Sequence, residues 1–166
     1  GPFACDNGLT YARFSSLSAV AADASGVHVV WNARTAARQS KVFVRNSPDG
    51  LTWTAPAVPV DTAAVGHQFF PDITTGAGAL SVVFQDSRGD PSYSPDLPPG
   101  DTAAGSNSGN VVQAIVARST TGGASWTESQ VSALGTNPNW EVRSGMRSPF
   151  FGDYNSISAV GDTILM

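Results

Sequence analysis

The sequence has little of what disulfide, metal-thiolate or nucleic-acid chemistry requires. Its 166 residues include one cysteine, Cys5, so neither an internal disulfide nor a cysteine-based metal site can form. We interpret Cys5 as an inert thiol or as one half of a bridge to a segment outside this sequence. Lys41 is the only lysine, the arginines are scattered, and the net charge is −4. Nucleic acids and anionic membranes are therefore not expected as partners.

Long apolar runs and helical periodicity are also missing. No run approaches the roughly 20 residues that span a bilayer, so no membrane span is expected. The 17 glycines and 11 prolines separate short segments rich in Val, Ile, Phe and Trp, which is typical of strands between turns. The sequence predicts an all-β chain, with strands at Gly26–Arg34, Lys41–Ser47, Ala79–Arg88 and Asn110–Ser119.

Two turn segments of the chain match each other. RNSPDGLTWT (Arg45–Thr54) and RSTTGGASWT (Arg118–Thr127) place their tryptophans, Trp53 and Trp126, 73 residues apart. Aligning Arg34 with Arg88 gives an offset of only 54 residues. The difference indicates an insertion in the second copy, which we assign to Gly89–Gly109 because it lacks strand character. Units of about 40 to 50 residues with four strands are typical of propeller blades.

Both turns resemble the Asp-box, or BNR repeat, with the pattern Ser-x-Asp-x-Gly-x-Thr-Trp. The segments FQDSRGDP and FFGDYNSISAV are similar to stretches of secreted bacterial sialidase-like propellers. The resemblance implies a β-propeller of sialidase type in which the box is a structural turn and its Trp packs between blades. Asn46 then stands at the Ser position, and Thr121 replaces the Asp of the second copy. The box residues it implies are Asn46, Asp49, Gly50, Trp53, Ser119, Gly123 and Trp126.

The repeat divides residues 1–166 into a partial propeller. Blade one is predicted at about 11–61, blade two at about 67–134 with the inserted loop 89–109, and the start of a third at 150–166. Propellers need four to eight blades, and open faces leave unpaired strand edges. We therefore expect a fragment of a larger propeller, whose remaining blades complete the ring. The alternative is a chain that pairs with other chains to complete it.

Strand direction predicts where ligands would bind. In an up-and-down blade the start of strand one and the end of strand two lie at the same end, opposite the Asp-boxes. Asp72 and Asp153 begin first strands, whereas Asp86 and Arg88 end a second strand just before the insertion. Loops on a rigid scaffold commonly carry function, so this end is the predicted site, with Asp72 and Arg88 binding substrate. The alternative for Asp86 and Arg88 is a salt bridge at a strand end.

The resemblance to sialidases also suggests catalytic residues. Sialidases use a tyrosine nucleophile, which needs a carboxylate base, so Asp86, Asp153 and Tyr154 are the candidate catalytic residues. Adjacent residues of a strand point to opposite sides, so Asp153 is not simply the partner of Tyr154. The alternative is an aspartate at the channel edge beside a packed tyrosine. Arg147, in MRSPFF, resembles the arginine of the Arg-Ile-Pro motif and is a third substrate-binding candidate, or else a surface residue.

Three functions remain open. The chain belongs to an exo-acting glycosidase of sialidase type, to a non-catalytic propeller that binds a glycan or glycoprotein, or to a structural part of a cell-surface assembly. The resemblance implies a secreted or cell-surface protein. No cofactor is expected, except that oxygen-rich residues in loop 89–110 would suit calcium, with a solvated Pro- and Gly-rich loop as the alternative. The residues concerned are Asp90, Asp96, Asp101, Asn107 and Asn110.

Overall fold

The protein is all-β, as the sequence predicts. The computed structural model describes residues 3–4, 10–11, 17–100, 111–138 and 152–166, and all regular structure in these ranges is strand. None of the described segments is a helix of the length and apolarity that crossing a membrane requires. The predicted strand at Gly26–Arg34 has the same bounds in the structure. The other three are confirmed with ends shifted by a few residues.

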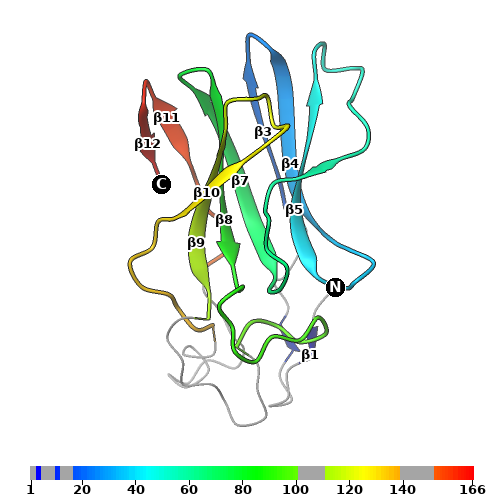
Figure 1. The fold of residues 1–166 in the computed structure, drawn as a ribbon, viewed down its shortest axis with the longest axis vertical. Coiled ribbons are helices and arrows are strands. Elements are labelled where there is room, and N and C mark those ends of the chain that lie inside the picture. Colours follow the sequence, from blue (N-terminus) through cyan, green and yellow to red (C-terminus); the bar gives the residue numbers. More distant parts are fainter. Residues whose placement is uncertain (1–2, 5–9, 12–16, 101–110, 139–151) are drawn as a thin grey trace.

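Two four-stranded antiparallel meanders form the body of the molecule (Figure 1). The first sheet has the order β3 (Ser18–Asp23), β4 (Gly26–Arg34), β5 (Ser40–Ser47) and β6 (Val58–Pro59). The second sheet has the order β7 (Gln68–Gly76), β8 (Ala79–Asp86), β9 (Gln113–Ser119) and β10 (Thr127–Gln130). In both sheets each strand pairs with the next along the chain.

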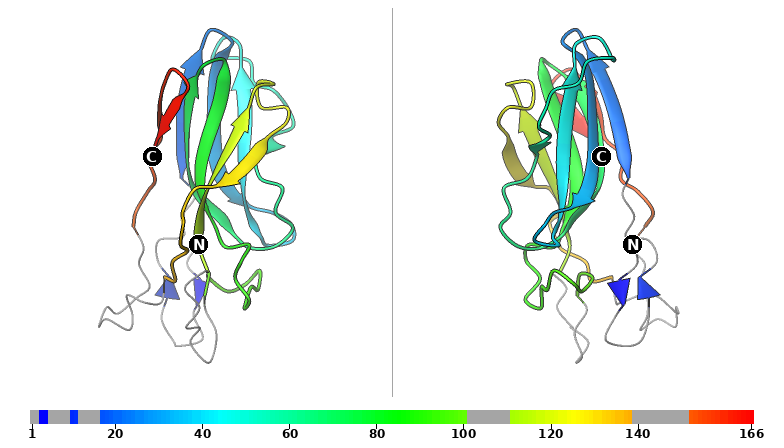
Figure 2. Two further views of the ribbon diagram at one scale, coloured as in Figure 1. Left: turned by 60° about the vertical axis from the view of Figure 1, so that its left-hand side comes forward. Right: turned by 90° about the vertical axis from the view of Figure 1, so that its right-hand side faces the viewer.

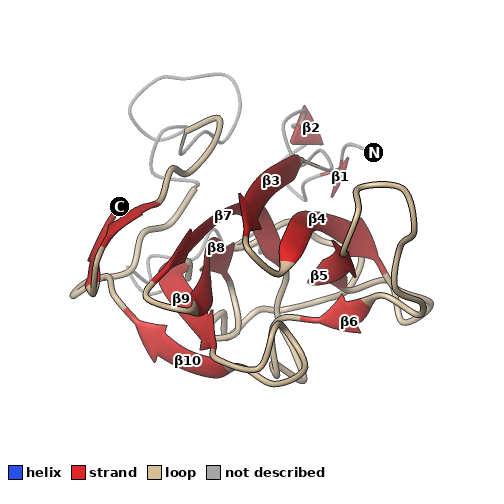
Figure 3. Cartoon of the chain, turned by 90° about the horizontal axis from the view of Figure 1, so that it is seen from above, coloured by secondary structure: helices blue, strands red, loops and turns tan. Residues whose placement is uncertain are grey.

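Two short hairpins accompany these sheets. β1 (Phe3–Ala4) pairs with β2 (Thr10–Tyr11), and β11 (Ser158–Val160) pairs with β12 (Thr163–Leu165). β11 lies against β7 on the side of the second sheet away from the first sheet. Seen from above, β3 and β7 lie next to each other while β6 and β10 lie at the far edges (Figure 3).

The main core lies between the two sheets. Val30, Val42 and Val44 of the first sheet pack against Phe84 and other apolar side chains of the second. A second cluster on the opposite face of the second sheet joins Val83 and Val116 to Ile157 and Ile164 of the C-terminal hairpin segment. Because both of its faces are covered, β8 is buried at nearly every position, whereas β4 and β5 alternate between buried and half-buried residues (Figure 2).

The hydrogen-bond register corrects the alignment of the two repeats by one residue. Val27 faces Ser47 in the first sheet, and Leu80 faces Ser119 in the second. Ser47, and not Asn46, is therefore the equivalent of Ser119. The first turn is one residue shorter before its tryptophan, so an alignment anchored on Trp53 and Trp126 shifts the strands. By the same register Arg34 matches Ser87 and not Arg88.

The two ends of the sheets differ in character. The end at the top of Figure 1, here called the turn end, carries the β3–β4 and β7–β8 turns and both Asp-box-like turns. The opposite end, here called the loop end, carries residues 35–39, 61–67 and 87–100. The antiparallel meander alone dictates this division, because β4 and β8 both run away from the turn end.

Candidate functional site

The first part of the inserted loop is folded against the loop end. Asp90 accepts hydrogen bonds from the backbone N–H of Ser92 (2.9 Å) and of Gly100 (2.6 Å), which ties the two ends of residues 90–100 together. Within this segment the backbone N–H groups of Asp90, Tyr93 and Leu97 each donate to the carbonyl oxygen three residues earlier. Residues 90–100 therefore form a compact loop closed by hydrogen bonds, here called the cap, which covers part of the loop end. This differs from the solvated loop expected for that stretch.

Two arginines meet on a single carboxylate of this cap. Arg34 ends β4 and reaches Asp96 Oδ1 at 3.0 Å, while Arg38 reaches Asp96 Oδ2 at 2.7 Å. Arg34 is oriented further by hydrogen bonds to the carbonyl oxygens of Arg38 and Pro95, both 2.8 Å. The arginine side chains remain 47% and 60% exposed. In this cluster, here called the arginine pair, two convergent donors at the loop end remain accessible to solvent.

His67 lies beneath the cap and is wholly buried. Its Nδ1 accepts the backbone N–H of Ser40 at 3.1 Å, so Nε2 carries the proton and faces the carbonyl oxygens of Ser94 and Leu97. The ring also contacts Tyr93 edge-on, with 5.3 Å between the ring centres. Burial lowers the pKa of His67 below its ordinary value of 6.5. The neutral imidazole thus joins β5, the start of β7 and the inserted loop.

We predict that this histidine makes stability pH-dependent. Because its pKa is lower in the folded state, the unfolded chain binds more protons below about pH 6.5, and stability falls as the pH drops. The slope contributed by one site reaches at most about 1.4 kcal/mol per pH unit. Urea unfolding between pH 7.5 and 5.5 should show this loss in the parent and a smaller loss in His67→Gln. Equal slopes in the two proteins would exclude His67 as the cause.

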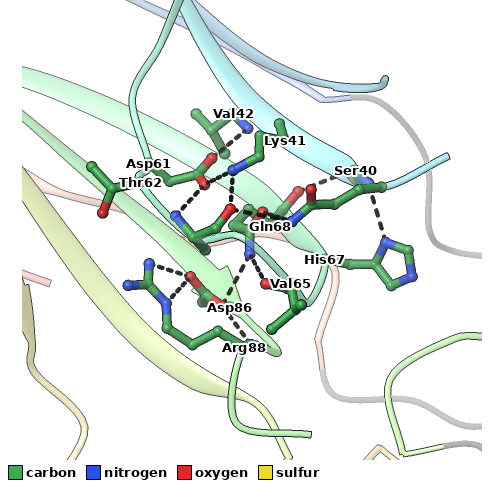
Figure 4. A network of polar contacts seen from close by, with 12 residues as sticks. Ser40, Lys41, Val42, Asp61, Thr62, Val65, His67, Gln68, Asp86 and Arg88 are labelled. Atoms are coloured by element: carbon green, nitrogen blue, oxygen red, sulfur yellow. Dashed lines mark hydrogen bonds and ion pairs between the residues drawn. The ribbon is translucent and has the colours of Figure 1, made fainter. Parts of the chain in front are cut away.

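A buried polar network joins the two sheets beside the histidine (Figure 4). Asp61, with no exposed side-chain surface, pairs with Lys41 Nζ at 2.5 Å and accepts the backbone N–H groups of Val42 and Ala63. Burial raises the pKa of Asp61, and the Lys41 ammonium opposes that shift. Gln68 continues the network by donating to Asp86 at 3.1 Å.

Asp86 and Arg88 form a salt bridge with each other. This is the alternative that the sequence offered to a substrate-binding role. Arg88 donates to Asp86 through its backbone N–H (2.6 Å) and through Nε (2.7 Å), and its Nη2 lies 2.7 Å from Glu128. The Asp86 side chain has no exposed surface. Glu128 in turn accepts the backbone N–H of Thr62 at 2.6 Å. These contacts link β10 of the second sheet to the segment after β6 and give both predicted residues a structural role.

Asp72 is also engaged with the protein. Its Oδ2 accepts the backbone N–H of Ile157 at 2.9 Å. The neighbouring Phe70 has a left-handed φ of 53° within a bulge of β7, and its carbonyl oxygen accepts the Asn155 amide at 2.8 Å. Asp72 therefore helps to hold the segment before β11 against β7.

The three catalytic candidates are not brought together. Gln85 donates to Asn155 at 3.0 Å on one face of the second sheet, whereas Asp86, the next residue, faces Gln68 and Arg88 on the other. Asp153 and Tyr154 precede Asn155 and are exposed, Tyr154 by 78%. The second sheet thus separates Asp86 from Tyr154. Arg147, Cys5 and residues 101–110 of the insertion lie outside the described residues.

The Asp-box-like turns are held by side-chain acceptors. In the first turn Asp49 accepts the backbone N–H groups of Thr52 (2.6 Å) and Leu51 (2.8 Å), which lower its pKa to about 2. In the second, Ser119 Oγ accepts the backbone N–H of Gly123 at 2.9 Å, and Thr121 Oγ1 accepts that of Ser125 at 3.0 Å. Asp49 and Thr121 thus have the same role, since each side chain accepts backbone N–H groups of its own turn.

The backbone of Asn46 pairs with Thr54 across the first turn, but its side chain does not bond the turn. Its amide instead donates to the Gly122 carbonyl oxygen at 2.8 Å, and its Oδ1 lies 2.7 Å from His28 Nδ1. It therefore ties the first sheet to the second turn. Gly50 and Gly123 have positive φ values of 74° and 86°, which glycine adopts without a Cβ penalty.

Both tryptophans are partly buried, and neither is exposed. Trp126 packs against the core between the sheets, as the Asp-box resemblance implies. Trp53 has the same place in a first sheet whose other face is not covered by any described element.

Sequence reasoning did not identify Arg38 and placed Asp96 only among calcium candidates. Arg34 and Arg38 are close in sequence and hydrogen-bond each other, but nothing local joins them to Asp96, which is 62 residues from Arg34. No group of three or more His, Cys, Asp or Glu side chains in the described ranges could hold a metal ion. No known protein-family model matches the sequence, and comparison with curated proteins gave no match.

Proposed function

We propose that this chain is part of a sialidase-type Asp-box propeller whose loop end binds an acidic sugar of an extracellular glycan. Two consecutive four-stranded meanders that pack face to face, each with the same kind of turn at the same end, support the propeller. The C-terminal hairpin, β11 and β12, packs on the outer face of the second sheet in the way that the second sheet packs on the first. On this proposal the protein is secreted or displayed at the cell surface, where such glycans are found.

The observation that carries the binding proposal is the arginine pair on Asp96. Guanidinium groups bind carboxylates through paired, charge-assisted hydrogen bonds. Arg34 and Arg38 make such contacts with both oxygens of one carboxylate while remaining half-exposed. The carboxylate of a sialic or uronic acid offers the same two acceptors. The ligand would displace Asp96, so Asp96 acts as an internal competitor.

Binding is favoured over cleavage because of where the candidate residues lie. Asp86 is buried in the network between the sheets, on the face opposite Tyr154. Hydrolysis remains the second candidate, favoured by the exposed Tyr154 next to Asp153 on the C-terminal hairpin segment. Release of fluorophore from a sialoside by the purified protein would establish that activity directly.

We predict opposite effects for changes on the two sides of the pair. Arg38→Ala should weaken binding to sialylated oligosaccharides about tenfold, because a charge-assisted hydrogen bond contributes roughly 1.5 kcal/mol. Asp96→Asn should strengthen it, because the internal carboxylate no longer competes. Titration monitored by ligand-observed NMR would measure both dissociation constants.

Arg45→Ala is the matched control for Arg38→Ala. Arg45 donates to the Thr54 carbonyl oxygen near the turn end, so its removal should leave glycan affinity unchanged. An asialo oligosaccharide controls for the ligand carboxylate. If Asp96→Asn weakens binding as much as Arg38→Ala does, the cluster is structural and the proposal is wrong.

A further inference from the structure

A second buried histidine, His28 of β4, lies at the turn end, and its side chain is only 3% exposed. The Asn46 amide determines which of its ring nitrogens carries the proton. Asn46 Nδ2 donates to the Gly122 carbonyl oxygen at 2.8 Å, so Asn46 Oδ1 is the atom that lies 2.7 Å from His28 Nδ1. Because an amide oxygen can only accept, Nδ1 is the donor. In the neutral ring Nε2 is therefore the unprotonated nitrogen.

A serine hydroxyl and a carboxylate face this nitrogen. Ser25 Oγ lies 3.4 Å and Asp23 Oδ1 lies 3.3 Å from His28 Nε2. Asp23 accepts both the hydroxyl of Ser25 (2.6 Å) and its backbone N–H (2.7 Å), which fixes the serine within the β3–β4 turn. If Nε2 takes up the hydroxyl proton, it gains Asp23 as an acceptor while Nδ1 keeps Asn46. The imidazolium then has an oxygen partner at each nitrogen.

The hydroxyl borders a cavity of about 490 Å³ at the same end of the molecule. The cavity lies between the β3–β4 turn, the β7–β8 turn and the second Asp-box-like turn, and its lining includes Asp23, Ser25 and Gly122. Ser25 is exposed, whereas His28 is buried. A molecule in the cavity can therefore reach the hydroxyl while the imidazole stays out of bulk water.

We propose that the turn end is an esterase site in which Ser25 is the nucleophile, His28 is the general base and Asn46 positions the imidazole. A hydroxyl, a base within hydrogen-bond reach and a third group that orients the base are the parts that acyl transfer requires. Hydrogen bonds from Ser25 lower the pKa of Asp23, so this carboxylate is charged at neutral pH and repels anions. The substrate class is therefore a small, uncharged ester. This site is independent of any ligand at the loop end.

The reaction is balanced without a cofactor. Ser25 Oγ forms a bond to the ester carbonyl carbon while the hydroxyl proton moves to His28 Nε2. The bond from that carbon to the alcohol oxygen breaks, and the alcohol leaves with the proton from Nε2. Water then attacks acyl-Ser25 and gives its proton to Nε2, and Ser25 Oγ leaves the acyl carbon and recovers that proton. The products are one alcohol and one carboxylic acid, and nothing is oxidised or reduced.

A fluorophosphonate probe tests the nucleophile directly, because an activated serine hydroxyl displaces its fluoride. The 1–166 chain should gain one probe mass, and peptide mapping should place it on Ser25. Ser25→Ala should abolish the labelling and lower the rate of p-nitrophenyl acetate hydrolysis at least about a hundredfold, with an unchanged melting temperature because Ser25 is exposed. Ser129→Ala, at an exposed serine of β10, is the matched control and should behave as the parent.

Asn46→Asp tests the base and its orientation. A carboxylate beside Nδ1 favours the imidazolium, so the pH of half-maximal hydrolysis should rise by about one unit, an effect that a purely structural role of Asn46 does not produce. An unchanged pH profile in the folded variant would overturn the assignment of His28 as the base. A parent protein that gains no probe mass, labelling of another serine, or equal hydrolysis by the parent and Ser25→Ala would overturn the whole proposal.

Discussion

Lys41→Met is expected to lower the free energy of unfolding by about 3–5 kcal/mol, the usual cost of removing one partner of a buried ion pair. Lys41 is 15% exposed at its side chain and Asp61 is fully buried. Without the ammonium group, Asp61 retains two backbone N–H donors but loses its counter-charge. Urea unfolding at pH 7 would measure the loss.

The dependence of this loss on pH and on a second substitution tests its cause. Burial already raises the pKa of Asp61, and loss of Lys41 raises it further, so protonation relieves the unpaired charge. The difference between parent and Lys41→Met should therefore shrink as the pH is lowered towards 4. Adding Asp61→Asn should recover part of the stability, because it removes the unpaired buried charge while its single amide oxygen still accepts one of the two backbone N–H groups. A loss below about 1 kcal/mol at pH 7 would indicate a pair that behaves as a surface ion pair.

Phe84→Ala is expected to destabilise the chain by about 3–5 kcal/mol, as large-to-small changes in a packed core do. Phe84 is fully buried and packs in the cluster between the two sheets. Its removal leaves a cavity that faces valines of both sheets, which are fixed by strand pairing and cannot collapse inward. Thermal and urea unfolding would both report the effect.

Trp31→Ala is the matched control for Phe84→Ala. The register makes Trp31 the equivalent of Phe84 in the first sheet, yet Trp31 is half-buried and stacks on Phe43, with 6.0 Å between ring centres. Since hydrophobic stabilisation scales with buried apolar area, its loss should be clearly smaller, although the side chain is larger. If the two variants lost equal free energy of unfolding, burial between the sheets would not explain how much this position of the repeat stabilises the protein.

The charged residues of the loop end fall into two groups: the exposed arginine pair, and the buried network that holds the sheets together. Arg34 and Arg38 retain solvent contact, so a ligand can exchange with Asp96. Asp86 and Arg88 are held in the contact between the sheets, with Glu128 as a third partner. Asp86 and Arg88, whose pairing the sequence offers, therefore stabilise the sheets. The arginine pair proposed to bind ligand meets Asp96, 62 residues from Arg34, only in the tertiary structure.

Local sequence determined the strands and the turns. Alternating Val, Ile and Phe residues between glycine and proline specify β4, β5, β8 and β9, because side-chain period and turn chemistry act over a few residues. The recurrence of SPDG and STTGG before a tryptophan likewise predicted two related turns. Even the ion pair of Asp86 with Arg88 follows from their spacing of two residues, with Asp86 at the end of β8 and Arg88 in the turn that follows.

Only the tertiary structure decided what each side chain faces. The one-residue shift that makes Ser47 the equivalent of Ser119 is visible in the hydrogen-bond register and not in a match of tryptophans. Coverage of the sheets decides that Phe84 is buried and Trp31 is half-buried at equivalent positions. The meeting of Asp96 with Arg34 joins residues 62 positions apart. Such contacts depend on how sheets and loops pack, and the hydrophobic effect that drives this packing is non-directional, so no short stretch of sequence specifies them.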